Sequence, residues 1–171
     1  MEISALRELF EDMSIEEKAG QLFQVAGAMF DENAVISGPM QEMGITREDV
    51  KLAGTVLGVM GAENIKSIQK NYMEQHPHGI PLIFMLDIIN GYRTVYPIPL
   101  AQGATFDPNL IKKCASMAAK EGAADGLHVT FSPMTDLVRD PRWGRVMEST
   151  GEDVYLNGLY AKAMVEGYQG N

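Results

Sequence analysis

The sequence predicts an α/β fold built on a parallel sheet. Three observations support this: apolar, strand-like runs at residues 54–59, 80–86 and 129–134, a helical pattern after each run, and turn-forming residues between them. Successive strand-then-helix units need right-handed crossovers, which place their strands side by side in one parallel sheet. The 171 residues amount to about one domain, which is long enough to bury a core.

The first part of the chain predicts helices. Residues 14–17 form a capping box, and the apolar residues that follow have helical spacing as far as Ala26. Residues 27–45 are rich in Gly and Met without a clear period, which indicates an irregular surface segment, and residues 46–49 predict the cap of another short helix. We therefore expect an N-terminal helical segment at residues 1–53, and the first βα units at residues 54–171.

The later elements have clearer start and stop signals. The run at residues 80–86 is almost wholly apolar, as in a strand buried on both faces of a parallel sheet. Asp107 as N-cap and Pro108 as first residue predict the start of a helix, and Asp153 predicts the start of the last one. The apolar stripe predicted for the first of these helices consists of Leu110, Ile111, Cys114, Met117 and Ala118.

Composition excludes several classes of function. The net charge is −9 and no basic patch interleaved with aromatic residues occurs, so neither nucleic acid nor a membrane surface is an expected partner. The lone Cys114 excludes an internal disulfide framework. No basic start followed by an apolar stretch opens the chain. We therefore expect a cytoplasmic protein if Met1 is the native start, and a periplasmic or secreted one if a leader was removed.

Two long polar loops follow predicted strands, at residues 87–93 and 136–153. Parallel α/β folds bind ligands at the carboxyl ends of their strands, so these loops are the candidate site. Asp87 ends an apolar strand, where an ionised carboxylate needs polar partners, although it could instead cap the following turn. Arg93 either returns to the same edge of the sheet or lies on the surface.

The second loop contains two arginines and the only tryptophan within residues 140–145. Guanidinium groups bind adjacent oxygens and an indole ring offers a flat apolar face, so this loop suits a polyhydroxylated ligand. One of Arg142 and Arg145 could pair with a loop carboxylate while the other faces the ligand, and the residues alone leave the choice open. Trp143 either stacks on a sugar or fills the rim. Glu152 and Asp153 are better explained as charges at a helix N-terminus than as a catalytic pair.

No cofactor or metal is expected. His76 and His78 flank a proline without a Cys or carboxylate at ligand spacing. Neither a phosphate-binding loop nor a nucleophile elbow occurs.

Several ordered motifs together resemble the N-terminal barrel domain of glycoside hydrolase family 3, especially that of bacterial β-glucosidases. The resemblance extends from residue 13 to residue 170. The residues that carry it are 80–82, 86–94, 96–100, 105–108, 131–134, 140–145 and 151–153.

This resemblance implies part of a (β/α)8 TIM-like barrel, with about three βα units preceded by N-terminal helices. It implies that Asp87 binds distal hydroxyls of the nonreducing-end sugar, with Arg93 beside it. Arg145 would also contact that sugar, which leaves Arg142 a structural role. Asn90 stands where relatives usually have His, and it is a secondary candidate with Arg142 and Trp143.

The implied reaction is hydrolysis of terminal nonreducing β-D-glucosyl residues with retention, on a β-glucoside or oligosaccharide. The family's nucleophilic aspartate, its lysine–histidine pair and its acid/base lie beyond this stretch, so we expect no catalytic residue in this chain. The intact protein would then add the rest of the barrel and a following α/β domain. The alternatives are a truncated, non-catalytic fragment and a β-xylosidase or arabinofuranosidase of the same family.

Overall fold

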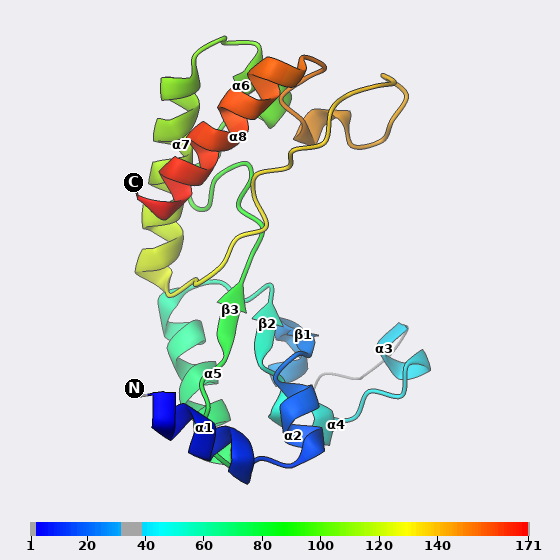
Figure 1. Cartoon of the computed structure of the whole chain (residues 1–171), viewed down its shortest axis with the longest axis vertical. Helices are drawn as coiled ribbons and strands as arrows, with labels where there is room; N and C mark the ends of the chain where they lie inside the picture. The colour runs from blue at the N-terminus through cyan, green and yellow to red at the C-terminus, as the bar shows by residue number, and fades with distance from the viewer. Residues whose placement is uncertain (1–2, 32–38, 171) are drawn as a thin grey trace. The chain divides into compact units, whose positions relative to one another are not determined.

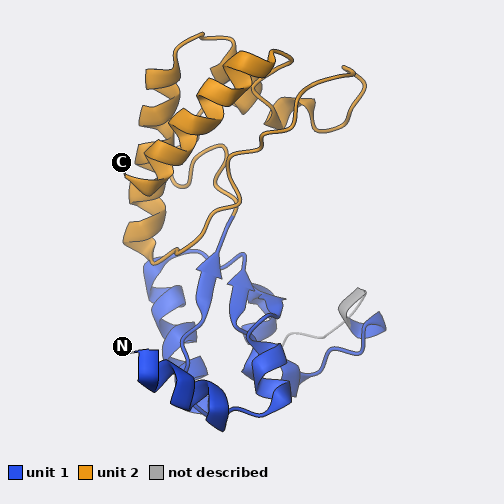
Figure 2. Cartoon of the chain, in the orientation of Figure 1, with its two compact units in different colours: residues 1–86 blue, residues 87–171 orange. Residues whose placement is uncertain are grey.

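The computed structural model describes residues 3–31 and 39–170, which form two compact units, residues 1–86 and 87–171 (Figures 1 and 2). The elements of the first unit are α1 (Ile3–Asp12), α2 (Ile15–Gly20), β1 (Gln24–Ala26), η1 (Gly27–Phe30), α3 (Pro39–Glu42), α4 (Arg47–Leu52), β2 (Thr55–Leu57), α5 (Ala62–Gln75) and β3 (Ile83–Met85). Those of the second are α6 (Pro99–Gly103), α7 (Pro108–Asp125), η2 (Val146–Glu148) and α8 (Val154–Gln169).

A three-stranded parallel sheet in the order β1-β2-β3 forms the centre of the first unit. The middle residues of the strands, Val25, Val56 and Phe84, lie opposite one another in register and are all 0% exposed, so one row of side chains forms the core of the sheet. The α/β fold class with a parallel sheet is thereby confirmed.

The first strand was missed by the sequence prediction. Helix α2 ends at Gly20 instead of continuing to Ala26, and residues 24–26 form β1. Gly20 packs so closely that a Cβ there would lie 2.5 Å from the carbonyl oxygen of Leu52. The backbone N–H of Thr55 also donates to the carbonyl of Phe23, which draws this segment toward β2. The pairing of residues 24–26 with β2 therefore overrides the helical spacing of the sequence. Three residues are too few for a sequence pattern to distinguish a strand from the end of a helix.

Local capping signals of the first unit are confirmed. In α2 the Ser14 side chain accepts the N–H of Glu17 while the Glu17 carboxylate accepts the N–H of Ser14, and Thr46 and Asp49 repeat this arrangement in α4. Each pair satisfies two backbone donors that the helix itself leaves without a partner.

Tyr72 attaches α5 to the segment before β2. This tyrosine is 5% exposed, and its hydroxyl donates to the carbonyl of Ala53 at 2.6 Å. His76, just after the helix, accepts the backbone N–H groups of His78 and Ile80 through Nδ1. The imidazole thus organises the turn before β3. Burial is the first cause that lowers the pKa of His76, which favours the neutral ring that these bonds require.

The stability of the first unit is expected to fall above pH 10. Burial raises the pKa of Tyr72 to about 12, whereas an unfolded tyrosine ionises near 10, so the folded state loses its advantage as pH rises from 10 to 12. The loss attributable to Tyr72 is about 2–3 kcal/mol. Urea unfolding at pH 8 to 11 should show a shallower decline for Tyr72→Phe than for the wild type, and parallel declines would contradict this assignment. The other tyrosines are common to both proteins and serve as the internal control.

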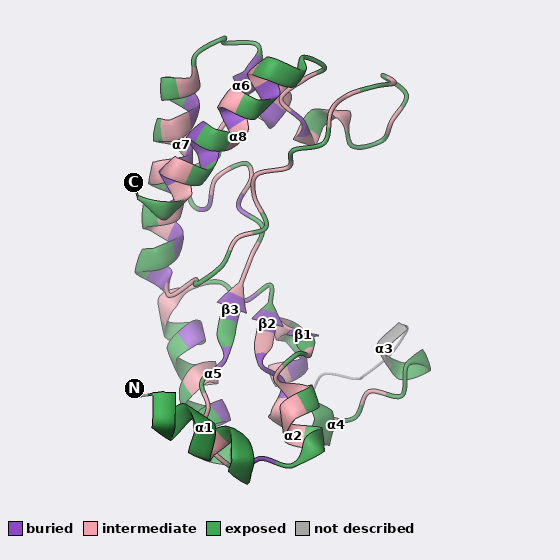
Figure 3. Cartoon of the chain, viewed as in Figure 1, coloured by how far each residue is buried: buried purple, intermediate pink, exposed green. Residues whose placement is uncertain are grey.

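The second unit is organised by the contact between α7 and α8, which bury Ile111, Ala115, Tyr160 and Met164 between them (Figure 3). The helices approach closely because Gly167 faces α7: a Cβ there would lie 2.5 Å from the carbonyl oxygen of Lys112. Both predicted helix starts are confirmed, since Asp107 accepts the N–H groups of Asn109 and Leu110, and Asp153 accepts that of Leu156.

The predicted apolar stripe of α7 was partly wrong. Leu110 and Met117 are 43% and 46% exposed. The buried positions are Ile111, Ala115, Ala118, Gly122 and Asp125. The period was right but its phase was shifted, because small residues face α8 where larger apolar side chains were expected.

The predicted strand at residues 129–134 was also wrong, since this segment contains only a single bridge residue, Val129. The hydroxyl of Thr130 accepts the N–H of Ser132, and Pro133, which follows a cis peptide bond, has no N–H to donate. Local hydrogen bonds to side chains therefore take the place of the backbone hydrogen bonds that a strand would make to its neighbour, and Pro133 has no N–H to join them.

Candidate functional site

Asp87 lies at the start of the second unit, two residues after β3 ends, with an exposed side chain. Its Oδ1 accepts the N–H of Ile89 and the hydroxyl of Ser132, both at 3.0 Å. Asp87 therefore caps the following turn, as the simpler interpretation predicted, and also joins a residue 45 positions away. Among the described residues, none donates a hydrogen bond to Oδ2, so one oxygen is fixed and the other faces solvent.

Ser132 and Tyr168 complete the surroundings of Asp87, and the sequence analysis assigned a role to neither. Burial is the main cause that raises the pKa of Tyr168; its hydrogen bond with Ser132 lowers that pKa and the charge of Asp87 raises it. Tyr168 therefore brings a phenol from α8 to the same place. Ser132 falls within one of the segments that carry the family resemblance, and Tyr168 lies within its overall extent, which was the signal available for finding them.

Both arginines of the second loop make two-pronged ion pairs. Arg142 binds the carboxylate of Asp140 through Nε and Nη2, and Arg145 binds that of Glu148 in the same way, at 2.9 and 2.7 Å. Both arginines pair within the loop, so the pairing alone does not show which of them has a structural role and which faces the ligand.

The two arginines differ in their more distant charges. The pKa of Arg145 is raised first by Glu148, and then also by the carboxylates of Asp136 and Asp87. That of Arg142 is raised by Asp140. The charge of Arg145 thus lies within electrostatic reach of Asp87.

The second loop is fixed from inside by Ser149, which is 0% exposed. Its hydroxyl donates to the carbonyl of Asp136 at 2.7 Å and accepts the N–H of Gly151 at 3.2 Å. The next residue, Thr150, packs on α6, where a Cβ added to Gly103 would lie 2.1 Å from the Thr150 carbonyl oxygen. The loop that carries Arg145 is therefore anchored in the interior of the second unit.

Arg93 pairs with Asp125 at the end of α7, at 2.6 Å from Nη2 to Oδ1. The arginine side chain is 66% exposed and the aspartate 6%, so the guanidinium covers a buried carboxylate while remaining open to solvent. Its hydrogen bond with Asp125 is the first cause that raises the pKa of Arg93. Asn90 is exposed and its carbonyl accepts the N–H of Tyr96, while Trp143 is half-buried and donates its backbone N–H to Asp140.

The structure thus brings the charges of Asp87 and Arg145 into one region, and attaches Arg93 to α7. The roles of all six predicted residues in sugar binding remain predictions. Among the described residues, no group of three or more His, Cys, Asp or Glu side chains could hold a metal ion. In the same part of the chain, no helix is long and apolar enough to cross a membrane.

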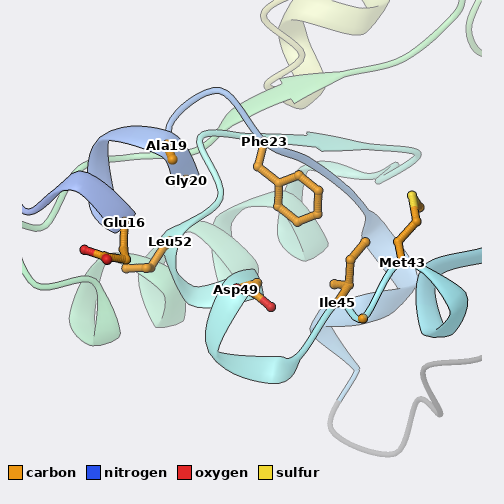
Figure 4. Close-up of a pocket in the computed structure, with 9 residues that line it drawn as sticks. Glu16, Ala19, Gly20, Phe23, Met43, Ile45, Asp49 and Leu52 are labelled. Carbon is orange, nitrogen blue, oxygen red and sulfur yellow. The ribbon is translucent and has the colours of Figure 1, made fainter.

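A separate groove of about 470 Å³ lies in the first unit, lined mainly by apolar groups of α2, α4 and the turns beside them (Figure 4). Phe23, Met43 and Ile45 gather around it, with the carboxylates of Glu16 and Asp49 nearby. It includes none of the predicted site residues.

Known proteins similar to this chain are enzymes that act on glycosides. A periplasmic β-glucosidase of Salmonella typhimurium is 34% identical over 165 residues, which cover 95% of this chain and 20% of that enzyme. A β-xylosidase of Formosa agariphila is 46% identical over 94 residues, covering 54% of this chain and 13% of that enzyme.

A solved structure gives the same result. The β-glucosidase of Listeria innocua in complex with glucose superposes with a TM-score of 0.91 at 50% identity, covering 100% of this chain and 24% of the enzyme. The chain thus spans about a fifth to a quarter of the length of the relatives that it matches along most of its own length.

The model of the glycosyl hydrolase family 3 N-terminal domain matches residues 14–171. The match covers almost the whole chain, and it agrees with the parallel sheet and with the structural superposition. The chain therefore belongs to glycosyl hydrolase family 3, as part of its N-terminal domain.

Proposed function

We propose that this chain supplies part of the sugar-binding subsite of a retaining enzyme that hydrolyses terminal nonreducing β-D-glucosyl residues. The observation that carries the proposal is the state of Asp87, an exposed carboxylate held through Oδ1 by Ser132 and Ile89. A carboxylate fixed in this way accepts hydrogen bonds from sugar hydroxyls without first losing side-chain freedom.

Arg145 and Arg93 complete the subsite in this proposal. Each has a guanidinium already tied to a carboxylate, Glu148 and Asp125, yet each remains 60% or more exposed. A guanidinium has five N–H donors, so an ion pair leaves donors for the hydroxyl oxygens of a sugar. Asn90 and Trp143 contribute secondary contacts, while Arg142 shapes the loop through Asp140.

The role of these residues is binding rather than bond breaking. Retaining hydrolysis requires a nucleophilic carboxylate and an acid/base carboxyl about 5–5.5 Å apart, and we place both outside this chain. Asp87, Arg93 and Arg145 hold the glucosyl ring away from the cleaved bond, and they supply binding energy rather than bond-breaking chemistry. Residues 24–171, which include β1 of the parallel sheet, then form part of a barrel that the remainder of the protein completes, before a following α/β domain.

A panel of aryl glycosides tests the proposed function on the complete enzyme. We expect aryl β-D-glucoside to be hydrolysed with the highest kcat/KM, ahead of β-D-xyloside and α-L-arabinofuranoside. Proton NMR should show the β-anomer of glucose as the first product, because retention preserves the configuration. Highest kcat/KM on β-xyloside would instead support the activity named for the Formosa agariphila relative. Hydrolysis of no β-glucoside would refute the proposal.

The alternative of a non-catalytic fragment has its own measurement. The isolated 171-residue chain is expected to hydrolyse no aryl β-glucoside. Turnover that persists through repurification and disappears with Asp87→Ala would show that the nucleophile lies in this chain after all.

A further inference from the structure

Two carboxylates of α7, Glu121 and Asp125, hold the loop that follows Asp87. Glu121 accepts the backbone N–H groups of Arg93 and Thr94, both at 2.9 Å, and the Thr94 hydroxyl at 2.6 Å. Asp125 accepts the Arg93 guanidinium at 2.6 Å. Residues four apart share one face of a helix, so α7 presents both carboxylates to this loop, and both of them bind Arg93.

The position of Asp125 is not explained by fold stability. It is 6% exposed and is the last residue of α7, where the negative end of the helix dipole disfavours a carboxylate. Its partner Arg93 is 66% exposed, and ion pairs that are open to solvent contribute little to fold stability. Its second oxygen, Oδ2, accepts the hydroxyl of Tyr92 at 2.7 Å, so the orientation of the carboxylate is set from both sides.

The loop itself is too tight to absorb a shift of Arg93. Gly91 has φ 95°, and a Cβ there would lie 1.9 Å from the carbonyl oxygen of Thr94. The N–H of Tyr96 donates to the carbonyl of Asn90 at 2.8 Å, which closes the turn. The orientation of the Arg93 side chain is therefore decided mainly by what its guanidinium binds.

We propose that Asp125 is a positioning residue of the sugar subsite: it holds Arg93 through Nη2, so that the other N–H groups of the guanidinium are kept in place for substrate hydroxyls. Glu121 fixes the backbone of Arg93 and Thr94, and Asp125 fixes the side chain of Arg93. This inference rests on the proposed function, and it adds a residue that touches no substrate.

The test is Asp125→Asn in the complete enzyme, assayed with aryl β-D-glucoside. Asparagine keeps the size of the side chain but removes the charge that orients Arg93. We expect KM to rise about tenfold while kcat stays within threefold, because a binding contact is loosened and the reacting groups are unchanged. Tyr92→Phe is the matched control, since it removes the hydrogen bond at the other oxygen and leaves the pair with Arg93. Its KM should change by less than threefold, and an equal rise in both variants would overturn the proposal.

A double variant separates positioning from general loosening. If Asp125 acts through Arg93, Asp125→Asn should add less than twofold to the KM of Arg93→Gln. Additive effects of the two substitutions would overturn the inference while leaving the proposed function intact. Lys112 is on the same helix as Asp125; Lys112→Met breaks its half-exposed pair with Glu166 of α8, and it should change thermal stability without changing KM. Wild-type enzyme that hydrolyses no β-glucoside would refute the proposed function, and this inference with it.

Discussion

Asp87→Asn is expected to lower kcat/KM for aryl β-D-glucoside by about 100- to 1000-fold in the complete enzyme. A hydrogen bond to a charged group contributes about 1.5–3 kcal/mol, and two such bonds to sugar hydroxyls at the lower end of that range, about 3–4 kcal/mol together, account for a loss of this size. Asparagine is preferred to alanine because its amide oxygen can still accept the N–H of Ile89 and the hydroxyl of Ser132. The turn is then retained, and the loss reports on the missing charge at the open oxygen.

Asp140→Asn is the control for this substitution. Asp140 is also a partly exposed loop carboxylate, but both of its oxygens bind Arg142. We expect less than a fivefold change in kcat/KM, since an exposed ion pair contributes at most about 1 kcal/mol. Equal losses in the two variants would mean that the assay reports general damage to the loops, and a loss of less than threefold at Asp87 would remove that residue from the subsite.

Gly103→Ala is expected to destabilise the second unit by about 3 kcal/mol. The new methyl group would lie 2.1 Å from the carbonyl oxygen of Thr150, which is backbone and has little room to move. Overpacking of an interior typically costs about 1–3 kcal/mol, and the upper end applies where backbone must shift. Because Thr150 adjoins Ser149, the anchor of the second loop, the variant should also bind substrate more weakly. Urea unfolding followed by circular dichroism measures the change in stability.

Gly158→Ala provides the opposite expectation within the same unit. Gly158 lies inside α8, and a Cβ there would meet no atom within 4 Å. Alanine is favoured over glycine in a helix by about 0.5–1 kcal/mol, so this variant should unfold at higher urea concentration than the wild type. If both glycine variants lose stability to the same extent, close packing at Gly103 is not the cause.

The fold was predictable wherever the signal was local. The capping residues Ser14, Thr46, Asp107 and Asp153 bind donors two or three residues away, so their spacing in the sequence already describes the contact. The strand at residues 24–26 gave no such signal, because its partner is β2 and three residues do not establish a period. The segment at residues 129–134 failed for the opposite reason: its composition suits a strand, but Thr130 supplies the backbone with a local alternative.

The candidate site was likewise predictable only where the signal was local. Asp87 was identified because it follows an apolar strand. Ser132 and Asp125, which hold Asp87 and Arg93, are separated from them by 45 and 32 residues. No spacing rule links residues so far apart, and only the folded chain shows which carboxylate or hydroxyl each of them meets. The arginine pairs are a different case: Asp140 and Glu148 lie only two and three residues from Arg142 and Arg145, and the spacing left open which arginine binds a carboxylate of the loop.

The close crossing of α7 and α8 also affects the position of the residue that follows Gly167. Gly167 fits against α7 because it has no side chain, and an added methyl group would strike Lys112 and Ala115. The next residue is Tyr168, whose phenol reaches Ser132 and, through it, Asp87. The small size of Gly167 therefore determines how closely α8 approaches α7, and with it the position of the Tyr168 phenol beside Ser132 and Asp87.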